Sequence, residues 1–324
     1  MAFLARAGGR LAFGRINKKN AGLRVFPEET TNSQAACVLY DEALILLRII
    51  FCLHNLHTLS YHAGNTKSGA LGYTLGDGKF VGFHTEMAEN IARDMQKNLG
   101  LAKLDIKYQP VTSQNRIPLV TNGTVDLECG STTNDLNRQK EVDFANTTYV
   151  EQVRIAVRKD SNIKEVEDLN GKTVATTTGT TSVQLLRQSK RGGNIDFKNI
   201  LGKDHADSFL LLETGRADAF VMDGSILAGN ISKSKNAKDF VIVGEPLSTE
   251  PIACMVRKND PAFLKAVNDS IARQANDGTL AKLWDKWFIQ PIPPANVAVG
   301  LPLSDATKNA WANPNNKPKE DYNK

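Results

Sequence analysis

Residues 112–134 read TSQNRIPLVTNGTVDLECGSTTN and place a helix signal, a strand signal and a polar turn in direct succession. We predict a short helix over 116–122, which Gly123 ends because glycine readily adopts the left-handed conformation of a helix C-cap. The segment VDLEC (125–129) is predicted to be a strand, and residues 131–133 supply hydroxyl groups just beyond it. This order of elements is the repeating unit of an α/β protein.

A second copy of this unit lies further along the chain. A helix signal ends at Gly215, and the sequence Gly-Arg-Ala-Asp leads into the apolar run AFVM (219–222). In the same way, Gly123 and the residues after it lead into the first strand. Two such copies favour two lobes of similar build.

Helix and strand signals alternate from about residue 80 onward. The clearest helix signal is the apolar series Phe83, Met87, Ile91, Met95 and Leu99, which recurs every four residues. Alternation of this kind predicts an α/β fold with parallel-rich sheets flanked by helices. Further strands are predicted at 104–108, 154–157, 173–176, 240–244 and 252–256, and further helices at about 181–191, 206–214, 223–231 and 260–276.

The composition fits a globular protein of two lobes. The chain has 324 residues, of which 41% are hydrophobic and 23% charged, and its mean hydropathy is −0.31. This length is sufficient for two lobes of ordinary domain size. The longest apolar run, 43–53, is interrupted by Arg48 and is too short for a membrane helix, which needs about 20 apolar residues.

The formal net charge is +5, and the excess of positive charge lies at the start of the chain. Residues 1–24 contain six basic residues and no acidic ones, so the remainder is close to neutral. Nucleic-acid binding is not expected, because no nucleic-acid-binding module accompanies the charge. Residues 1–62 contain no convincing secretory signal and receive no structural assignment. The polar segment 312–324 is predicted to be a flexible tail.

The chain has four cysteines, at positions 37, 52, 129 and 254. None forms a CxxC pair, and no histidine neighbours them at zinc-finger spacing, so a metal site is not predicted. Cys129 and Cys254 each lie in an apolar, strand-like run. Their spacing leaves two alternatives open, which are buried thiols and a disulfide.

Several polar segments near predicted helix starts are suited to binding a carboxylate. Arg116 begins a short helix, and its planar guanidinium can pair with both oxygens of a carboxylate. A surface arginine is the alternative. Hydroxyl groups at 131–133, before a helix predicted to begin near Asn134, and at 177–182, before another helix, are suited to an anion. Ordinary helix caps are the alternative there.

His205 and Asp223 complete the set of candidate residues. His205 could donate a hydrogen bond to a second carboxylate, although a lone histidine more often has a structural role. Asp223 follows a strand at its carboxyl end, where ligands bind open α/β sheets. It could pair with an ammonium group or cap the next helix. The sequence has no GxSxG, no HExxH and no nucleophile paired with a base, so no catalytic residue, metal or cofactor is predicted.

These stretches resemble the periplasmic glutamate/aspartate-binding proteins of ABC importers, within the polar-amino-acid solute-binding family. The resemblance extends from about Ser68 to the C-terminus. It rests on runs in the same order as in the family: TSQNRIPL-x-x-NGT-x-D-x-ECGSTTN (112–134), TTS (180–182), KDH-x-DSF (203–209), MD (222–223), CM-x-RK-x-DP (254–261) and WFIQPIPP (287–294).

The resemblance implies the two-lobed periplasmic-binding-protein fold of type II, in which two extended crossover strands form a hinge. Lobe one would combine 63–152 with 250–311, and lobe two would comprise 153–249. The lobes would close around L-glutamate or L-aspartate and deliver it to the membrane permease subunits of an ABC importer. The protein would be a periplasmic monomer and not an enzyme.

The resemblance also implies roles for individual residues. Arg116 would hold the α-carboxylate, Asp223 the ammonium group and His205 the side-chain carboxylate. Cys129 and Cys254 would form a disulfide, which an oxidising compartment allows. The residues facing the ligand would be Ser113, Arg116, Ser131 and Thr133 from lobe one, and Thr178, Thr181, His205 and Asp223 from lobe two.

The N-terminal part departs from the family. The family's first strand ends in a G-x-R motif whose arginine contacts the ligand's side-chain carboxylate, and Asn65 occupies that place here. Lys67 would be a partial substitute, because a point charge does not copy a bidentate fork. Three explanations stay open: a start that differs from the true N-terminus, a changed ligand, or a decayed copy that has lost its first strand and exposes a sheet edge.

Three other functions are compatible with this scaffold. A dehydratase-like enzyme would use a cleft carboxylate as acid or base, with Glu128 and Glu151 as the nearby candidates, and arogenate or prephenate would test it. A sensory domain would need a membrane span. A binder of another polar amino acid, such as glutamine, would be distinguished by a competition assay.

Overall fold

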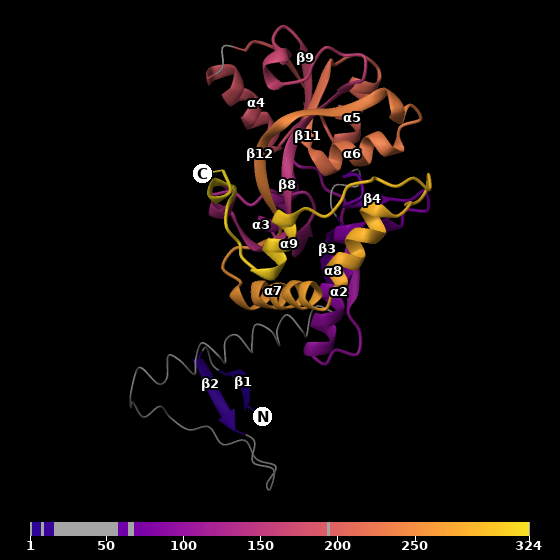
Figure 1. Cartoon of the computed structure of the whole chain (residues 1–324). Coiled ribbons are helices and arrows are strands. Elements are labelled where there is room, and N and C mark those ends of the chain that lie inside the picture. Colours follow the sequence, from indigo (N-terminus) through magenta and orange to yellow (C-terminus); the bar gives the residue numbers. More distant parts are fainter. Residues whose placement is uncertain (1, 8–9, 16–57, 64–67, 193–194, 324) are drawn as a thin grey trace. The chain divides into compact units, whose positions relative to one another are not determined.

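A computed structural model of the chain describes residues 2–7, 10–15, 58–63, 68–192 and 195–323 (Figure 1). It divides into two compact units, 1–55 and 56–324. In the first unit, β1 (Ala2–Ala7) and β2 (Arg10–Arg15) pair as antiparallel strands. The second unit contains all the residues of the candidate site.

The second unit is built on one mixed sheet of eight strands. These are β3 (Thr58–Ala63), β6 (Asp105–Tyr108), β7 (Leu127–Cys129), β8 (Val142–Arg158), β9 (Thr173–Thr177), β10 (Lys198–Gly202), β11 (Ala219–Asp223) and β12 (Phe240–Arg257). Their order is β10-β9-β11-β8-β12-β7-β3-β6. Parallel pairs join β10, β9 and β11 on one side and β7, β3 and β6 on the other. The pairs that β8 and β12 make between these two groups are antiparallel.

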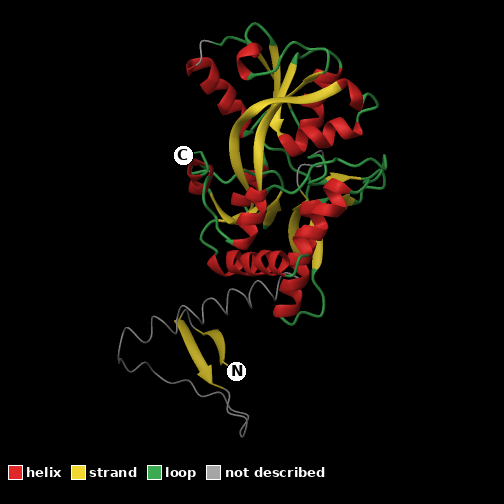
Figure 2. Cartoon of the chain, in the orientation of Figure 1, coloured by secondary structure: helices red, strands yellow, loops and turns green. Residues whose placement is uncertain are grey.

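Helices flank the strands in both lobes (Figure 2). We use lobe one as a name for the group of β3, β6 and β7 with α2 (Phe83–Asn98), α3 (Arg116–Thr121), α7 (Pro261–Asn276), α8 (Thr279–Trp284) and α9 (Asp305–Ala312). We use lobe two as a name for the group of β9, β10 and β11 with α4 (Thr181–Gly192), α5 (His205–Glu213) and α6 (Gly224–Lys233). Smaller elements are the hairpin β4 (Tyr73–Thr74) and β5 (Phe80–Val81), the short turns η1 (Arg138–Lys140), η2 (Val166–Leu169), η3 (Ala237–Asp239) and η5 (Lys319–Asp321), and the π-helical η4 (Asp285–Ile289).

The predicted helix periodicity is confirmed for α2. Phe83, Met87, Ile91 and Met95 are buried, whereas Leu99 follows the helix and is exposed. At the start of α7, the carboxylate of Asp260 accepts a hydrogen bond from the backbone N–H of Phe263 at 3.1 Å, as a helix N-cap does. The helix boundaries therefore follow from local apolar spacing and capping.

Each lobe has a buried apolar core beside its strands. In lobe one, Phe83 and Tyr149 lie against Trp284, with ring centroids 5.5 and 5.7 Å away. In lobe two, Ile155 and Val221 belong to a buried cluster that also includes Leu186 of α4. A further buried cluster contains residues of both lobes, among them Phe83 of α2 and Leu227 of α6, so the apolar packing continues from one lobe into the other.

The two longest strands, β8 and β12, run from one lobe into the other (Figure 1). Where they cross, Val150 pairs with Pro251 and Glu151 with Glu250. The sequence predicted separate strands at 154–157, 240–244 and 252–256, but the structure places them within these two continuous strands. A register shift between Val243 and Ser248 interrupts the pairing of the two strands, and Pro246 lies within it.

The helix predicted to begin near Asn134 is absent from the structure. The backbone N–H of Asn134 donates to the carbonyl of Pro251 at 2.9 Å, and Thr133 forms an isolated bridge with Ile252. Only the short turn η1 follows, at Arg138–Lys140. The segment therefore adds to the edge of β12, and this pairing replaces the helical hydrogen bonds that the sequence suggested.

Two terminal segments differ from their sequence-based descriptions. Strand β3, within the unassigned region 1–62, lies between β6 and β7, so the first strand of the lobe-one sheet is present. At the other end, the segment expected to be a flexible tail makes specific hydrogen bonds. The carbonyl of Asn315 accepts from the N–H of Thr147 at 2.8 Å, and Asn323 pairs with the backbone of Thr249 at 2.9 and 2.7 Å. Hydrogen bonds to the backbone of β8 and β12 therefore hold this polar segment.

Candidate functional site

Seven of the eight residues expected to face a ligand are buried. They come from segments of both lobes that follow strands β7, β9 and β11 or begin helices α3, α4 and α5. Thr178 is half-buried, and its hydroxyl donates within lobe two to the carbonyl of Gly202 at 3.1 Å. The structure therefore buries seven of the eight predicted ligand-binding residues and leaves Thr178 partly exposed.

Arg116 is the first residue of α3 and is only 3% exposed. Its Nε atom has no hydrogen-bond partner among the described residues. Burial is the main cause that lowers the pKa of Arg116 to about 10, and nearby Arg138 lowers it further. The group therefore stays charged near neutral pH. A buried, under-satisfied guanidinium is suited to binding an anion.

His205, the first residue of α5, reaches across to lobe one. Its Nε2 atom lies 3.5 Å from the hydroxyl of Ser113, and its Nδ1 atom lies 3.0 Å from the hydroxyl of Thr177. Burial, with a smaller contribution from Arg116, lowers the pKa of His205 to about 3. The imidazole is therefore neutral at pH 7 and has one N–H to donate.

The two loops that carry these residues are in close contact. Gly179 has a φ of +80°, and a Cβ atom there would lie 2.7 Å from the Cα of Gln114. A side chain at this position would therefore strain the backbone and clash with lobe one. Arg138 adds a polar contact between the lobes, because it donates to the carbonyls of Thr133 at 2.9 Å and Gly179 at 3.3 Å.

Asp223 ends β11 and precedes α6, and it is 1% exposed. Its Oδ1 atom has no hydrogen-bond partner among the residues that the structure describes. Burial and the nearby carboxylates of Glu151 and Glu250 raise the pKa of Asp223 well above its usual range. A ligand cation beside Asp223 would oppose that shift by favouring the charged form.

The sequence analysis missed Glu250, which lies on β12 at the crossing and is fully buried. Its Oε2 atom accepts hydrogen bonds from the hydroxyls of Thr133 at 2.6 Å and Thr181 at 2.8 Å. Two of the predicted ligand-binding hydroxyls, one from each lobe, therefore share one carboxylate. The sequence feature that could have indicated Glu250 is a charged residue placed just before the apolar strand IACMV (252–256).

Two further buried carboxylates, those of Glu151 and Glu128, accept hydrogen bonds from neighbouring groups. Glu151 accepts from the backbone N–H of Gln152 at 2.8 Å and from the hydroxyl of Ser225. Glu128 accepts from the hydroxyl of Thr132 at 2.7 Å. Burial raises the pKa of both Glu151 and Glu128. Both residues thus make local structural contacts at the start of α6 and beside β7.

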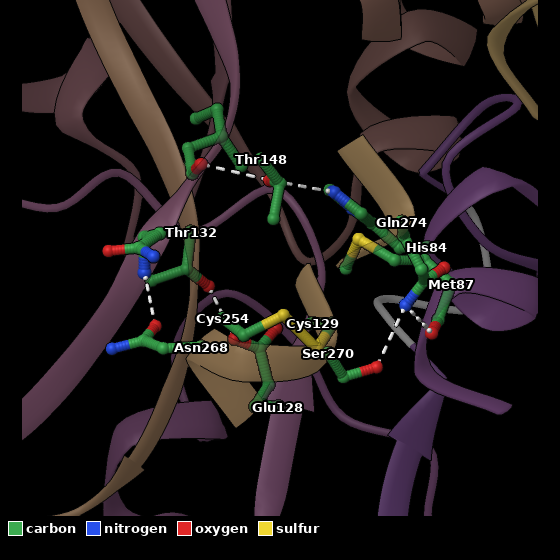
Figure 3. The surroundings of a disulfide bond; sticks show 12 residues. His84, Met87, Glu128, Cys129, Thr132, Thr148, Cys254, Asn268, Ser270 and Gln274 are labelled. Carbon is green, nitrogen blue, oxygen red and sulfur yellow. Dashed lines mark hydrogen bonds between the residues drawn. A yellow bond between two sulfur atoms is a disulfide. The ribbon is translucent and has the colours of Figure 1, made fainter. Parts of the chain in front are cut away.

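Cys129 and Cys254 form a disulfide between β7 and β12 (Figure 3). Nearby, the Nε2 atom of His84 lies 3.0 Å from the hydroxyl of Thr148, which donates to the carbonyl of Ile252 at 2.9 Å. The disulfide therefore ties together two strands of lobe one next to Glu128 and the segment that carries the predicted hydroxyl groups.

Residues 65–290 match the family of bacterial extracellular solute-binding proteins, family 3. The chain belongs to this family. It is 44% identical to an L-glutamate/L-aspartate-binding protein of Pseudomonas aeruginosa over 75% of this chain and 80% of the relative. It is 45% identical to a glutamate/aspartate import solute-binding protein of Salmonella typhimurium over 74% and 79% of the two chains. A solved structure of an ancestral arginine-binding protein bound to arginine superposes with a TM-score of 0.64 at 30% identity, covering 72% of this chain and 98% of that chain.

Membership of family 3 confirms the two-lobed fold and the resemblance that the motifs indicated. Asn65, which occupies the place of the family's arginine, and Lys67, two residues further on, lie outside the described residues. Among the described residues, no helix is long and apolar enough to cross a membrane. That part of the chain also contains no group of three or more histidine, cysteine or acidic side chains arranged to hold a metal ion.

Proposed function

We propose that this family 3 protein is the solute-binding component of an ABC amino-acid importer and captures L-glutamate or L-aspartate between its lobes. Hinge closure at the crossing of β8 and β12 would enclose the ligand in the periplasm, and the closed protein would deliver it to a permease in the membrane. The observation that carries the proposal is the buried guanidinium of Arg116 with its unpartnered Nε atom. The names of the relatives from Pseudomonas aeruginosa and Salmonella typhimurium support the choice of ligand.

In this proposal, the three charged or polar groups of an acidic amino acid meet three different partners. The α-carboxylate pairs with Arg116, assisted by hydroxyls of Ser113, Ser131 and Thr133. The ammonium group pairs with Asp223. Charge-assisted hydrogen bonds of this kind contribute about 1.5–3 kcal/mol each, so two or three of them supply much of the ~8 kcal/mol of a micromolar complex.

The side-chain carboxylate would accept a hydrogen bond from His205, with hydroxyls of lobe two beside it. The contact of His205 with Ser113 at 3.5 Å supports closure, because it joins residues from both lobes. We also propose that lobe one combines 63–152 with 250–311 and that lobe two comprises 153–249. The disulfide supports an oxidising, extracytoplasmic setting.

Binding without catalysis is favoured by the contacts of the two carboxylates that an enzyme would use. Glu151 already accepts hydrogen bonds from Gln152 and Ser225, and Glu128 from Thr132. These contacts account for Glu151 without a substrate, whereas the Oε1 atom of Glu128 has no hydrogen-bond partner among the described residues. Incubation with prephenate or arogenate should accordingly yield no aromatic product.

Calorimetric titration of the purified protein with L-glutamate, L-aspartate and L-glutamine tests the proposed function. We expect saturable binding of the two acids near micromolar concentrations and much weaker binding of glutamine. Fluorescence of Trp284, Trp287 and Trp311 provides a parallel measurement. Tighter binding of glutamine than of the two acids would mean that the ligand is another polar amino acid and not an acidic one. No binding by a folded monomer would contradict the proposal.

A further inference from the structure

The carboxylate of Glu250 connects the two lobes through hydroxyl groups. Its Oε2 atom accepts from Thr133, which follows β7 in lobe one, at 2.6 Å. The same atom accepts from Thr181, the first residue of α4 in lobe two, at 2.8 Å. The hydroxyl of Ser248 donates to the other carboxylate oxygen at 3.1 Å. All four side chains are buried.

Each of these hydroxyl groups has a single proton to donate. While Thr133 and Thr181 donate to Glu250, neither can donate to another carboxylate at the same time. A ligand carboxylate that uses these hydroxyls must therefore displace Glu250 from them. Glu250 and an acidic ligand also carry the same charge, so they repel one another at short range.

We propose that Glu250 is an internal competitor of the ligand carboxylate, which holds the lobes together through Thr133 and Thr181 and lowers the affinity for acidic amino acids. The effect on affinity rests on the proposed function, because it assumes an acidic ligand. The contact between the lobes does not depend on that function. In energetic terms, the contact stabilises a closed state that does not bind ligand. The apparent dissociation constant equals the intrinsic one divided by the fraction of molecules that are in the binding-competent state.

The variant Glu250→Gln tests the competition, since an amide keeps the size of the side chain and removes the charge. We expect the Kd for L-glutamate to fall about tenfold, which corresponds to ~1.4 kcal/mol. The matched control is Glu245→Gln, the same substitution at an exposed position of the same strand, and its Kd should equal that of the wild type. An unchanged or higher Kd in Glu250→Gln would mean that Glu250 only orients the two threonines.

A double-mutant cycle with Thr181→Val separates the two roles further. In the wild-type background, the substitution removes a ligand contact and a contact of the competitor, so its effect on Kd is partly cancelled. In the Glu250→Gln background, only the ligand contact is lost, so the effect on Kd should be larger. Equal effects in both backgrounds would overturn the competition.

Small-angle X-ray scattering without added amino acid keeps this test separate from the proposed function. We expect the radius of gyration of Glu250→Ala to exceed that of the wild type and of Glu245→Ala, because alanine removes the oxygen that accepts from Thr133 and Thr181. Equal radii would overturn the bridging role, even if the wild type binds L-glutamate. If no acidic amino acid binds the wild type, the proposed function fails, whereas a larger radius in Glu250→Ala would still support the bridge.

Discussion

Replacing Gly229 with alanine should weaken ligand binding without weakening the fold. Gly229 lies in α6 of lobe two and faces the segment of lobe one around Gly69. A Cβ atom at Gly229 would lie 2.8 Å from the Cα of Gly69 and 3.2 Å from the backbone N of Ala70. One turn further along α6, the ammonium group of Lys233 donates to the carbonyl of Gly69 at 3.1 Å. This helix therefore forms part of the surface along which the lobes meet.

The magnitude follows from the size of the clash. Non-bonded carbon atoms approach to about 3.5–4.0 Å, so the two backbones must separate by roughly 1 Å. Overpacking of this kind costs about 1–3 kcal/mol. If closure is required for binding, the Kd should rise by about 5- to 150-fold. The helix itself should gain up to about 1 kcal/mol, because alanine is a better helix former than glycine.

Two measurements separate these effects. Calorimetric titration with L-glutamate gives the Kd, and thermal unfolding without added amino acid gives the Tm, which should stay the same or rise by a few degrees. The matched control is Gly192→Ala in α4, where an added Cβ meets nothing within 4 Å. An unchanged Kd in Gly229→Ala would refute the reasoning, and so would a lowered Tm accompanying the weaker binding.

Three further predictions concern the charged and covalent parts of the site. Arg116→Lys should raise the Kd for L-glutamate about tenfold or more in titration calorimetry, because an ammonium group cannot form the bidentate pair; the same substitution at an exposed arginine should have no effect. Replacing Cys129 and Cys254 by serine should lower the free energy of unfolding by about 2–4 kcal/mol, measured with urea, because the bond closes a long loop; equal midpoints for the two proteins would contradict this. Burial lowers the pKa of His84 and His205 to about 3, so their contribution to stability is complete above pH ~6.5 and is lost as the pH falls toward 3. Between pH 6 and 5, His205→Asn should show a pH slope of unfolding free energy that differs from the wild type by up to ~1.4 kcal/mol per pH unit, and an identical slope would mean that His205 is not buried neutral.

The elements of both lobes could be predicted because their signals are local. The four-residue apolar spacing from Phe83 to Met95 corresponds to α2, and the glycine after α3 marks its end with a φ of +78°. Arg116, His205 and Asp223 were candidates because each follows a strand or begins a helix. The pairing of Cys129 with Cys254, in contrast, came from the family resemblance and not from spacing.

Contacts between distant segments decided what local signals could not. The prediction of a helix near Asn134 was wrong because its backbone N–H donates to the carbonyl of Pro251, which no local pattern reports. Thr133 and Glu250, separated by 117 residues, and Thr181 and Glu250, separated by 69, meet only because the lobes are closed on one another.

The sequence by itself thus determined the α/β alternation, the family motifs and most of the polar groups of the candidate site. Local propensity and apolar periodicity depend on residues a few positions apart, so they can be recognised in a single sequence. The tertiary structure decided that β8 and β12 are continuous and that Gly229 faces Gly69. It also decided that a hinge carboxylate engages the hydroxyls proposed for the ligand, because such contacts depend on how two packed lobes meet and not on the residues beside each group.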